Sequence, residues 1–270
     1  MSDLQQLKVD VAFLQETHLC NANVATLKRS WVGQVYHSKF NAKARGTAIL
    51  INKNISFHSQ EVISDPNGRY VIVVGQLFAN PVILVNLYAP NCDDCNFFEK
   101  LFLTIPKIDN GYLIIGGDFN LVLDVTLDRS STNPQSPSRS AGVVSDFMCQ
   151  CGLSDVWRFQ FPHTRSYSFF SNVHHTYTRI DYFLLDNRLL PKVKTCSYTS
   201  IVISDHSAIQ FDLDLPNRPP PNRIWRLNPL LSSDEKFVEF ISSQIELFLE
   251  TNTSPEISCH IMETLKVYSR

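Results

Sequence analysis

Short apolar runs separated by turn residues dominate the pattern of this chain. The run at 9–15 is almost unbroken, which is typical of a strand covered on both faces. Turn signals such as the Asp-Pro-Asn-Gly sequence at 65–68 separate the further strands that we expect, at 46–52, 70–77, 82–88, 112–116, 179–185 and 208–215. Apolar residues recur at helical spacing over 97–103 and 143–151. Strands therefore outnumber helices, and the pattern predicts an α/β sandwich with helices on the outside.

Pro216 begins a stretch rich in proline, asparagine and arginine that cannot continue a sheet. We expect three parts, namely a folded domain at 1–215, an extended linker at 216–230 and a helical segment at 231–270. In the last part Ser232 with Glu235 resembles a capping box, and apolar residues follow at helical spacing over 237–248. A second helical pattern at 262–268 runs to the end of the chain, so we expect this segment to lead toward a further C-terminal domain.

Bulk properties limit the class of protein. A chain of 270 residues with 44% hydrophobic and 11% aromatic residues can bury a full core and is expected to be globular. Its formal net charge of −2 is not that of a polycation, so contact with nucleic acid has to come from a local basic face. No apolar run approaches membrane-spanning length, and the first residues lack the pattern of a secretory signal. No membrane partner is expected.

Seven cysteines are an odd number for a disulfide framework, so we expect a reducing, intracellular compartment. Cys92 and Cys95 form a single C-x-x-C, and Cys149 and Cys151 form a C-x-C that could complete four zinc ligands. The second pair flanks a helix end before Gly152, and free cysteine commonly packs as a small hydrophobe. Packing is therefore favoured over zinc binding.

Four acidic clusters each stand at the end of an apolar run. They centre on Glu16, Asp118, Asp181 and Asp205, and the last is followed by His206. A strand fixes the backbone at such a place, while the loop after it leaves the side chain open to a substrate. Taken singly, each cluster also fits a solvated side chain or an Asx turn. Taken together, they indicate carboxylates and one histidine gathered at a divalent-metal site, as a phosphodiester-cleaving enzyme would use.

Longer motifs run in a fixed order through nearly the whole chain. They are Gln15-Glu16-Thr17, Asn86-Leu87-Tyr88-Ala89-Pro90-Asn91, Gly117-Asp118-Phe119-Asn120, Asp128-Arg129-Ser130, Tyr167-Ser168-Phe169-Phe170-Ser171, His174-His175-Thr176-Tyr177, Arg179-Ile180-Asp181-Tyr182 and Ser204-Asp205-His206. Together they resemble the endonuclease/exonuclease/phosphatase family, and most closely the endonuclease domain encoded by LINE-type retrotransposons. The hairpin-like stretch at 169–177 is the most subfamily-specific part of the resemblance.

This resemblance implies a DNase I-like fold, which is a four-layered sandwich of two mainly antiparallel β-sheets flanked by helices. It implies an endonuclease that uses Mg²⁺, or alternatively Mn²⁺, to hydrolyse a phosphodiester bond. The substrate would be duplex DNA, nicked in one strand to leave a 3′ hydroxyl for target-primed reverse transcription. A C-terminal reverse transcriptase domain would be the partner in a full-length protein. Access to target DNA would require the nucleus, although the sequence carries no clear targeting signal.

The resemblance assigns the metal, the attacking water and one phosphate oxygen to four residues. Glu16 and Asp205 would be the metal ligands, since Mg²⁺ prefers carboxylate oxygens and keeps waters that a phosphate can replace. Asp118 would orient and deprotonate a water, and Asn120 would hold a phosphate oxygen with its amide.

The resemblance assigns the phosphate itself to a histidine and its neighbours. His206 would meet the phosphate and would be oriented by Asp181. Pairing an imidazole with a buried carboxylate raises its proton affinity, so it can stabilise charge on the transition state. Tyr88 would add a phenolic hydrogen bond at the same place.

Candidate DNA contacts are Arg129, Ser168, Asn172 and Thr176. Positioning on a duplex relies on phosphate contacts and on local groove shape, which suits a polar hairpin. Ser168 stands where retrotransposon relatives commonly have threonine, so the hydroxyl is kept. For Arg129, a solvent-facing side chain is the alternative.

One part of the family pattern is expected to be missing. Family members begin with a strand that carries an asparagine near the metal, and 4–7 here reads as the end of the helix that follows that strand. Loss of the strand would expose a sheet edge and impair the enzyme. A catalytically dead truncated remnant is one alternative, and an abasic-site repair nuclease of the same family is another. A phosphoinositide phosphatase is disfavoured because the hairpin resembles a duplex-reading element.

Overall fold

The computed structural model describes residues 9–19, 26–28, 30–41, 43–107, 110–131, 136–173, 175–199, 205–215 and 233–251. The helix end expected at 4–7, the linker at 216–230, the capping residue Ser232 and the helical pattern at 262–268 lie outside these residues. The chain divides into two compact units, Met1–Pro219 and Pro220–Arg270. All strands of the described residues belong to the first unit.

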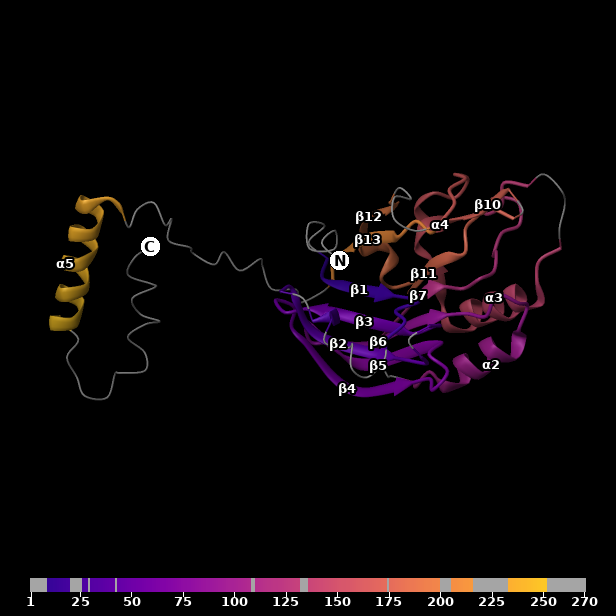
Figure 1. Ribbon diagram of the computed structural model, residues 1–270, viewed down its shortest axis with the longest axis horizontal. Coiled ribbons are helices and arrows are strands. Elements are labelled where there is room, and N and C mark those ends of the chain that lie inside the picture. Colours follow the sequence, from indigo (N-terminus) through magenta and orange to yellow (C-terminus); the bar gives the residue numbers. More distant parts are fainter. Residues whose placement is uncertain are drawn as a thin grey trace. The chain divides into compact units, whose positions relative to one another are not determined.

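A six-stranded sheet forms the centre of the first unit (Figure 1). Its strands lie in the order β4-β5-β6-β7-β11-β8. Their bounds are Phe57–Ser64 for β4, Tyr70–Leu77 for β5, Asn80–Tyr88 for β6, Tyr112–Asp118 for β7, Asp181–Asp186 for β11 and Leu153–Asp155 for β8. β6 and β7 pair in parallel, while the other neighbours pair antiparallel. β5 and β6 read as near-continuous apolar runs because both of their faces are covered.

Three smaller sheets complete the unit. Their strands are β1 Val11–Leu14, β2 Val32–Ser38, β3 Thr47–Asn52, β9 Phe169–Ser171, β10 Thr176–Thr178, β12 Val193–Tyr198 and β13 Ile209–Leu213. β1, β3 and β2 form an antiparallel sheet in that order, and β12 pairs antiparallel with β13. β9 and β10 form a two-stranded hairpin at the stretch expected at 169–177, and β10 ends one residue beyond it, at Thr178.

Two helices, α2 Cys95–Thr104 and α3 Arg139–Cys151, lie side by side along the six-stranded sheet (Figure 1). Each begins at a side chain that accepts a backbone N–H of the first turn, from Asp94 for α2 and from Ser138 for α3. α3 ends at Gly152, whose φ of 62° is the left-handed conformation that glycine adopts without strain. The sequence therefore fixes both helices through their caps as well as through their apolar faces.

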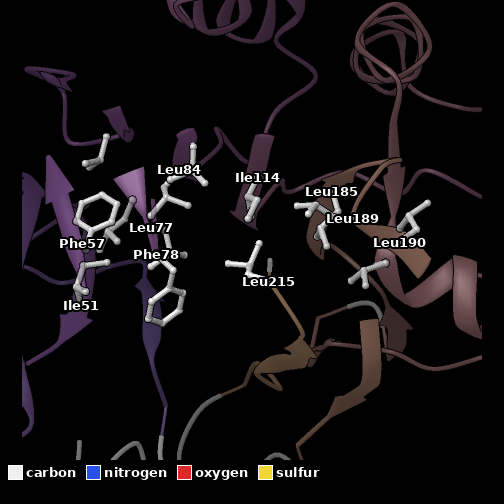
Figure 2. Packing of buried hydrophobic residues seen from close by; sticks show 14 of the residues in the cluster. Ile51, Phe57, Leu77, Phe78, Leu84, Ile114, Leu185, Leu189, Leu190 and Leu215 are labelled. Carbon is white, nitrogen blue, oxygen red and sulfur yellow. The ribbon is translucent and has the colours of Figure 1, made fainter. Parts of the chain in front are cut away.

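Apolar side chains fill three interfaces between these layers. One lies between the six-stranded sheet and the smaller sheets, where Leu84 of β6 belongs to the same cluster as Ile51 of β3 and Leu215, which follows β13 (Figure 2). A second lies under α2 and α3 and includes the buried ring of Phe98. A third covers the outer face of β1 and β3 and includes Trp31. The succession of layers confirms the expected DNase I-like sandwich.

The strand expected at 70–77 coincides with β5, and the other expected strands and both expected helices are present with shifted ends. The apolar pattern does not predict β2, β4, β8, β12 or the short helix α4, Val156–Gln160. β4 interrupts its apolar residues with exposed polar ones such as Glu61, and β8 is only 3 residues long. A weak or short alternation of this kind is not distinguishable from a loop by sequence.

Helix α5, Glu235–Thr251, is the described element of the second unit. The side chain of Asp234 accepts the backbone N–H of Phe237 at 3.2 Å and so caps its first turn. Apolar side chains on α5 are exposed, among them Phe240 and Leu247. In the described parts of the chain, no helix is both long enough and apolar enough to cross a bilayer.

The buried amide of Asn86 joins the six-stranded sheet to the sheet of β1, β3 and β2, close to the ends of β1 and β6. Its nitrogen donates to the carbonyl oxygens of Leu14 at 2.9 Å and Ala48 at 2.8 Å. Its oxygen accepts from the side-chain nitrogen of Gln15 at 2.6 Å. The end of β1, and with it the following residue Glu16, is therefore tied to the central sheet.

We expect Asn86→Ala to lower the free energy of unfolding by about 1–3 kcal/mol. The reason is that the carbonyl oxygens of Leu14 and Ala48 and the side-chain nitrogen of Gln15 would lose their hydrogen-bond partner. Urea unfolding followed by circular dichroism measures the change. The exposed Asn91→Ala is the matched control and should shift the free energy by less than about 0.5 kcal/mol. Equal unfolding midpoints for the two variants would show that the amide bridge contributes nothing.

Candidate active site

Three neighbouring strands bring polar residues to one edge of the six-stranded sheet. Tyr88 at the end of β6 lies opposite Asp118 at the end of β7, and Asp118 lies opposite Asp181 at the start of β11. The parallel pairing of β6 with β7 and the antiparallel pairing of β7 with β11 produce this alignment. Gly117 permits the close approach, because at its φ of +135° an added Cβ would lie 2.0 Å from the carbonyl oxygen of Leu87. Residues far apart in the sequence thereby become neighbours.

The carboxylate of Asp118 is buried and held by the turn that follows it. It accepts the backbone N–H of Asn120 at 2.9 Å and the side-chain amide of Asn120 at 3.1 Å. Asn120 has a φ of 49°, a left-handed conformation that asparagine tolerates better than most residues. Burial, followed by the negative charge of Asp181, raises the pKa of Asp118 to about 7. Asp118 can therefore take up a proton near neutral pH.

Asp181 and His206 form a hydrogen-bonded pair beside Asp118. Nδ1 of His206 lies 2.8 Å from Oδ2 of Asp181. Burial lowers the pKa of His206, but the hydrogen bond to Asp181 and the charge of that carboxylate outweigh it and raise the pKa to about 9. The imidazole is therefore positively charged at neutral pH.

Asp118, Asp181 and His206 are also a compact group of potential metal ligands. One ligand atom of each lies within 4.8 Å of those of the other two. The carboxylates suit a divalent cation that prefers oxygen ligands. The raised pKa of Asp118 reflects two carboxylates that share a buried space, and a cation would relieve this repulsion. The two carboxylates therefore fit a divalent cation, whereas the protonated imidazole has no free electron pair for one at neutral pH.

Glu16 and Tyr88 form a second pair next to this group. Glu16 follows β1 with a φ of 50°, and its Oε1 accepts a hydrogen bond from the phenol of Tyr88. Burial, followed by this hydrogen bond, raises the pKa of Tyr88 far above its ordinary value. The phenol therefore stays protonated. The negative charge of Glu16 contributes to the raised pKa of Asp118, so Glu16 lies within the electrostatic field of the site, and its metal-ligand role stays a prediction.

The other predicted residues lie around the histidine and the hairpin. Asp205 is exposed beside His206, and its charge contributes to the raised pKa of the imidazole. Asn172 is exposed between β9 and β10, and Thr176 is the half-buried first residue of β10. Arg129 is half-buried and its backbone forms a bridge with β10. Metal binding by Asp205 and DNA binding by the other three stay predictions.

Ser168 occupies a different place from the expected DNA contact. Its side chain is 0% exposed, and its hydroxyl oxygen accepts the backbone N–H groups of Ile180 at 3.0 Å and Asp181 at 3.1 Å. A fully buried hydroxyl offers no surface to DNA. We therefore correct the expectation for Ser168 from direct DNA contact to holding the backbone at the start of β11.

Arg179, two residues before Asp181, belongs to a charge cluster with Asp128, Asp155 and Arg158. We call it the buried charge cluster, because Arg179 and both aspartates are buried and Arg158 is partly buried. The Nε and Nη2 atoms of Arg179 donate to the two oxygens of Asp128, each at 2.8 Å. Its Nη1 lies 2.6 Å from an oxygen of Asp155. Arg158 also donates to Asp128, at 2.5 Å. Two arginines balance two aspartates, which is the condition under which buried charges are tolerated. The cluster anchors the entry to β11 and so the position of Asp181.

Sequence analysis did not identify Asn86, Asp128, Arg179 and Arg69 as residues that position the site. Arg69 donates to the carbonyl oxygen of Tyr88 at 3.3 Å, and its guanidinium lies 5.0 Å from the centre of the Tyr88 ring. The available signal was a charged residue at the border of an apolar run, as at Arg179, because such a residue needs a partner when it is buried. The identity of the partner does not follow from spacing.

Comparison with known proteins agrees with this geometry. The model of the Endonuclease/Exonuclease/phosphatase family matches residues 1–206. The chain belongs to this family. It is 27% identical over 246 residues to the Transposon TX1 uncharacterized 149 kDa protein of Xenopus laevis, a match that covers 89% of this chain and 19% of the relative. The chain therefore spans a small part of the length of this relative.

Solved structures of two AP endonucleases and of one retrotransposon endonuclease domain share the fold. An AP endonuclease of Leishmania major has a TM-score of 0.65 at 19% identity, over 80% of this chain and 81% of that one. An AP endonuclease of Archaeoglobus fulgidus has a TM-score of 0.62 at 20% identity, over 79% and 92%. The endonuclease domain of TRAS1, a telomere-specific non-LTR retrotransposon, has a TM-score of 0.57 at 17% identity, over 80% and 90%. The transposon relative and the TRAS1 domain confirm the resemblance that the motifs indicated.

We expect Asp181→Asn to bring the pKa of His206 well below 9, because burial then acts without the opposing carboxylate. In the native chain the raised pKa contributes stability that is complete below pH 6.5 and is lost as the pH rises through about 9. NMR titration of the imidazole C–H signals of metal-free protein measures the pKa, with His206→Gln to assign the signals. An unchanged pKa in Asp181→Asn would mean that another group holds the imidazolium.

Proposed function

We propose that this chain is a Mg²⁺-dependent endonuclease that nicks one strand of duplex DNA by hydrolysis and leaves a 3′ hydroxyl. The observation that carries the proposal is the meeting of Asp118 with the Asp181–His206 pair at adjoining strand ends. Membership of the family supports phosphodiester chemistry, and the transposon relative supports DNA as the substrate.

Asp118 acts as the general base in this mechanism. With a pKa of about 7 it can accept a proton from water near neutral pH. The water oxygen then forms a bond to phosphorus while the bond from phosphorus to O3′ breaks. O3′ takes up a proton from a solvent water and leaves as the 3′ hydroxyl, and the phosphate stays on the 5′ side of the next nucleotide. Asn120 holds the base in place through its backbone and side-chain N–H groups. Its amide nitrogen also donates to the carbonyl oxygen of Ala89 at 3.0 Å, so it has to exchange one of these partners to hold a phosphate oxygen.

His206 stabilises the negative charge that develops on the phosphate oxygens. Its pKa of about 9 keeps the imidazole protonated at neutral pH, and Asp181 fixes its orientation through Nδ1. Tyr88 stands on the neighbouring strand with a protonated phenol, and this phenol has to leave its hydrogen bond with Glu16 before it can donate to the phosphate. Asp118 therefore supplies the base, and His206, held by Asp181, supplies the positive charge.

Glu16 and Asp205 would hold the Mg²⁺. Carboxylate oxygens are the ligands that Mg²⁺ prefers, and Mn²⁺ accepts the same ligands. When bound, the cation supplies positive charge that offsets the charge of the phosphate. Without a cation, the acidic residues of the site would repel the phosphates of DNA. Their negative charge is therefore the reason why we propose that the enzyme requires a divalent cation.

Duplex DNA would be positioned by the hairpin, with Asn172 at its exposed tip and Thr176 and Arg129 alongside. The match to a 149 kDa transposon protein supports the proposal that the nuclease works as part of a longer protein. The reverse transcriptase that we propose in this longer protein rests on the resemblance of the motifs. In that protein the 3′ hydroxyl would serve as the primer. Its site of action would be the nucleus, where target DNA lies.

An abasic-site nuclease is the second candidate, because two AP endonucleases share the fold. Parallel assays on an intact AT-rich duplex and on the same duplex with one abasic site separate the two functions. Nicking of the intact duplex at a similar rate favours the retrotransposon-type function. Cleavage confined to the abasic duplex would replace our proposal with repair.

We expect Asp118→Ala and His206→Ala each to lower the rate of Mg²⁺-dependent nicking of supercoiled plasmid by about a hundredfold or more. Each removes a group that handles a proton or a charge in the transition state, while the fold measured by circular dichroism should persist. Asp146→Ala, an exposed aspartate on α3, is the matched control and should nick at the native rate. Absence of nicking by the native chain with either Mg²⁺ or Mn²⁺ would overturn the proposed function.

Replacing the hairpin tip, residues 172–176, by a short glycine turn should change where duplex DNA is cut more than how fast the bond breaks. The reason is that a hairpin in a groove reads DNA through its shape and deformability. Sequencing the nick positions on one plasmid with the native and the replaced chain gives both maps. Identical maps would mean that the tip has only a structural role.

A further inference from the structure

Ser168 joins three segments of the chain at one buried point. Its backbone N–H donates to the carbonyl oxygen of Thr178 at 3.0 Å, which closes the base of the hairpin. Its carbonyl oxygen accepts the N–H of Ser207 at 2.6 Å, next to the candidate catalytic histidine. Its hydroxyl accepts the N–H groups of Ile180 and Asp181 at 3.0 and 3.1 Å. The hairpin, the start of β11 and the histidine segment therefore meet at this residue.

β9, which follows Ser168, continues the same connection. Phe169 forms a bridge with His206, and the N–H of Phe170 donates to the carbonyl oxygen of Asp205 at 3.4 Å. The ring of Phe169 lies against the imidazole, with 4.8 Å between the ring centres. The histidine is thus held by β9 on one side and by Asp181 on the other.

The hydroxyl of Ser168 is committed to the protein interior. The side chain is 0% exposed, and a hydroxyl oxygen has two acceptor sites, which the two N–H groups use. Without this oxygen, two buried donors would lose their acceptor, and the backbone would move to regain one. The moving backbone is that of Asp181, whose carboxylate holds His206.

We infer that Ser168 is a positioning residue that sets the geometry of the Asp181–His206 pair. It acts through the backbone of β11 and touches neither DNA nor the reacting phosphate. A displacement of about 1 Å in such a pair can lower a catalytic rate by about a hundredfold. The same residue begins the hairpin, so the element expected to meet DNA and the pair that meets the phosphate share one anchor.

The first test needs no enzymatic activity and uses three variants of the whole chain. Ser168→Ala removes the hydroxyl, Ser168→Thr keeps it, and the exposed Ser145→Ala is the matched control. Amide hydrogen exchange at Ile180 and Asp181 should become faster by about tenfold or more in Ser168→Ala and stay native in the other two. The ring nitrogen NMR signals of the histidine should also move in Ser168→Ala alone. Native exchange and native ring signals in Ser168→Ala would overturn the inference.

The second test rests on the proposed nuclease function. Ser168→Ala should lower kcat for nicking by about tenfold to a hundredfold, while KM stays within about twofold and the nick positions stay native. Ser168→Thr should restore kcat. In a His206→Ala background, Ser168→Ala should cause no further loss, because both changes disable the same pair.

Two kinetic outcomes would overturn the inference. A raised KM with native kcat would indicate a DNA contact, and a full additional loss in the His206→Ala background would indicate a role unrelated to the pair. A chain that never nicks, while exchange and ring signals respond as expected, would count against the proposed nuclease function and would leave the positioning role supported.

Discussion

The register between β6, β7 and β11 is the constraint on which the candidate site depends. Successive side chains of a strand point to opposite faces, so a one-residue slip of β11 would turn Asp181 away from Asp118 and break its pair with His206. Buried apolar side chains on both faces of these strands make such a slip costly. Gly117 adds a steric constraint, because β7 approaches Leu87 of β6 too closely there to accommodate a side chain. The chemistry is therefore fixed by packing that lies outside the site.

Charge is distributed in two contrasting ways around this register. The buried charge cluster contains as many arginines as aspartates, so it can hold the backbone without any added ion. The edge with the candidate catalytic residues carries four carboxylates and one imidazolium, from Glu16, Asp118, Asp181, Asp205 and His206. Its excess negative charge contributes to the raised pKa of Asp118. The charges of the buried charge cluster balance one another, whereas a bound cation would offset the excess negative charge of the edge with the candidate catalytic residues.

The sequence predicted the layers and the central residues of the site because both depend on local pattern. β5 and β6 are apolar runs, and Asp118, Asp181 and His206 stand in motifs with family precedent. The weaker strands were not predictable, since their alternation is broken by exposed polar residues. Partnerships between distant segments were not predictable either. Burial decided the place of Ser168, and burial arises only when three segments that are separate in sequence meet.

The bridge between Phe169 of β9 and His206, with the hydrogen bonds beside it, would limit how the proposed target preference can change in related copies of such a chain. The tip of the hairpin lies beyond this bridge, and Val173 there is 83% exposed. Substitutions at the tip leave the hydrogen bonds of Ser168 intact, whereas substitutions at Ser168 or Phe169 alter the surroundings of His206. If the chain acts as proposed, a lineage could explore new insertion sites through substitutions at the tip alone. The residues proposed to cut DNA would stay in place, because the base of the same hairpin holds them.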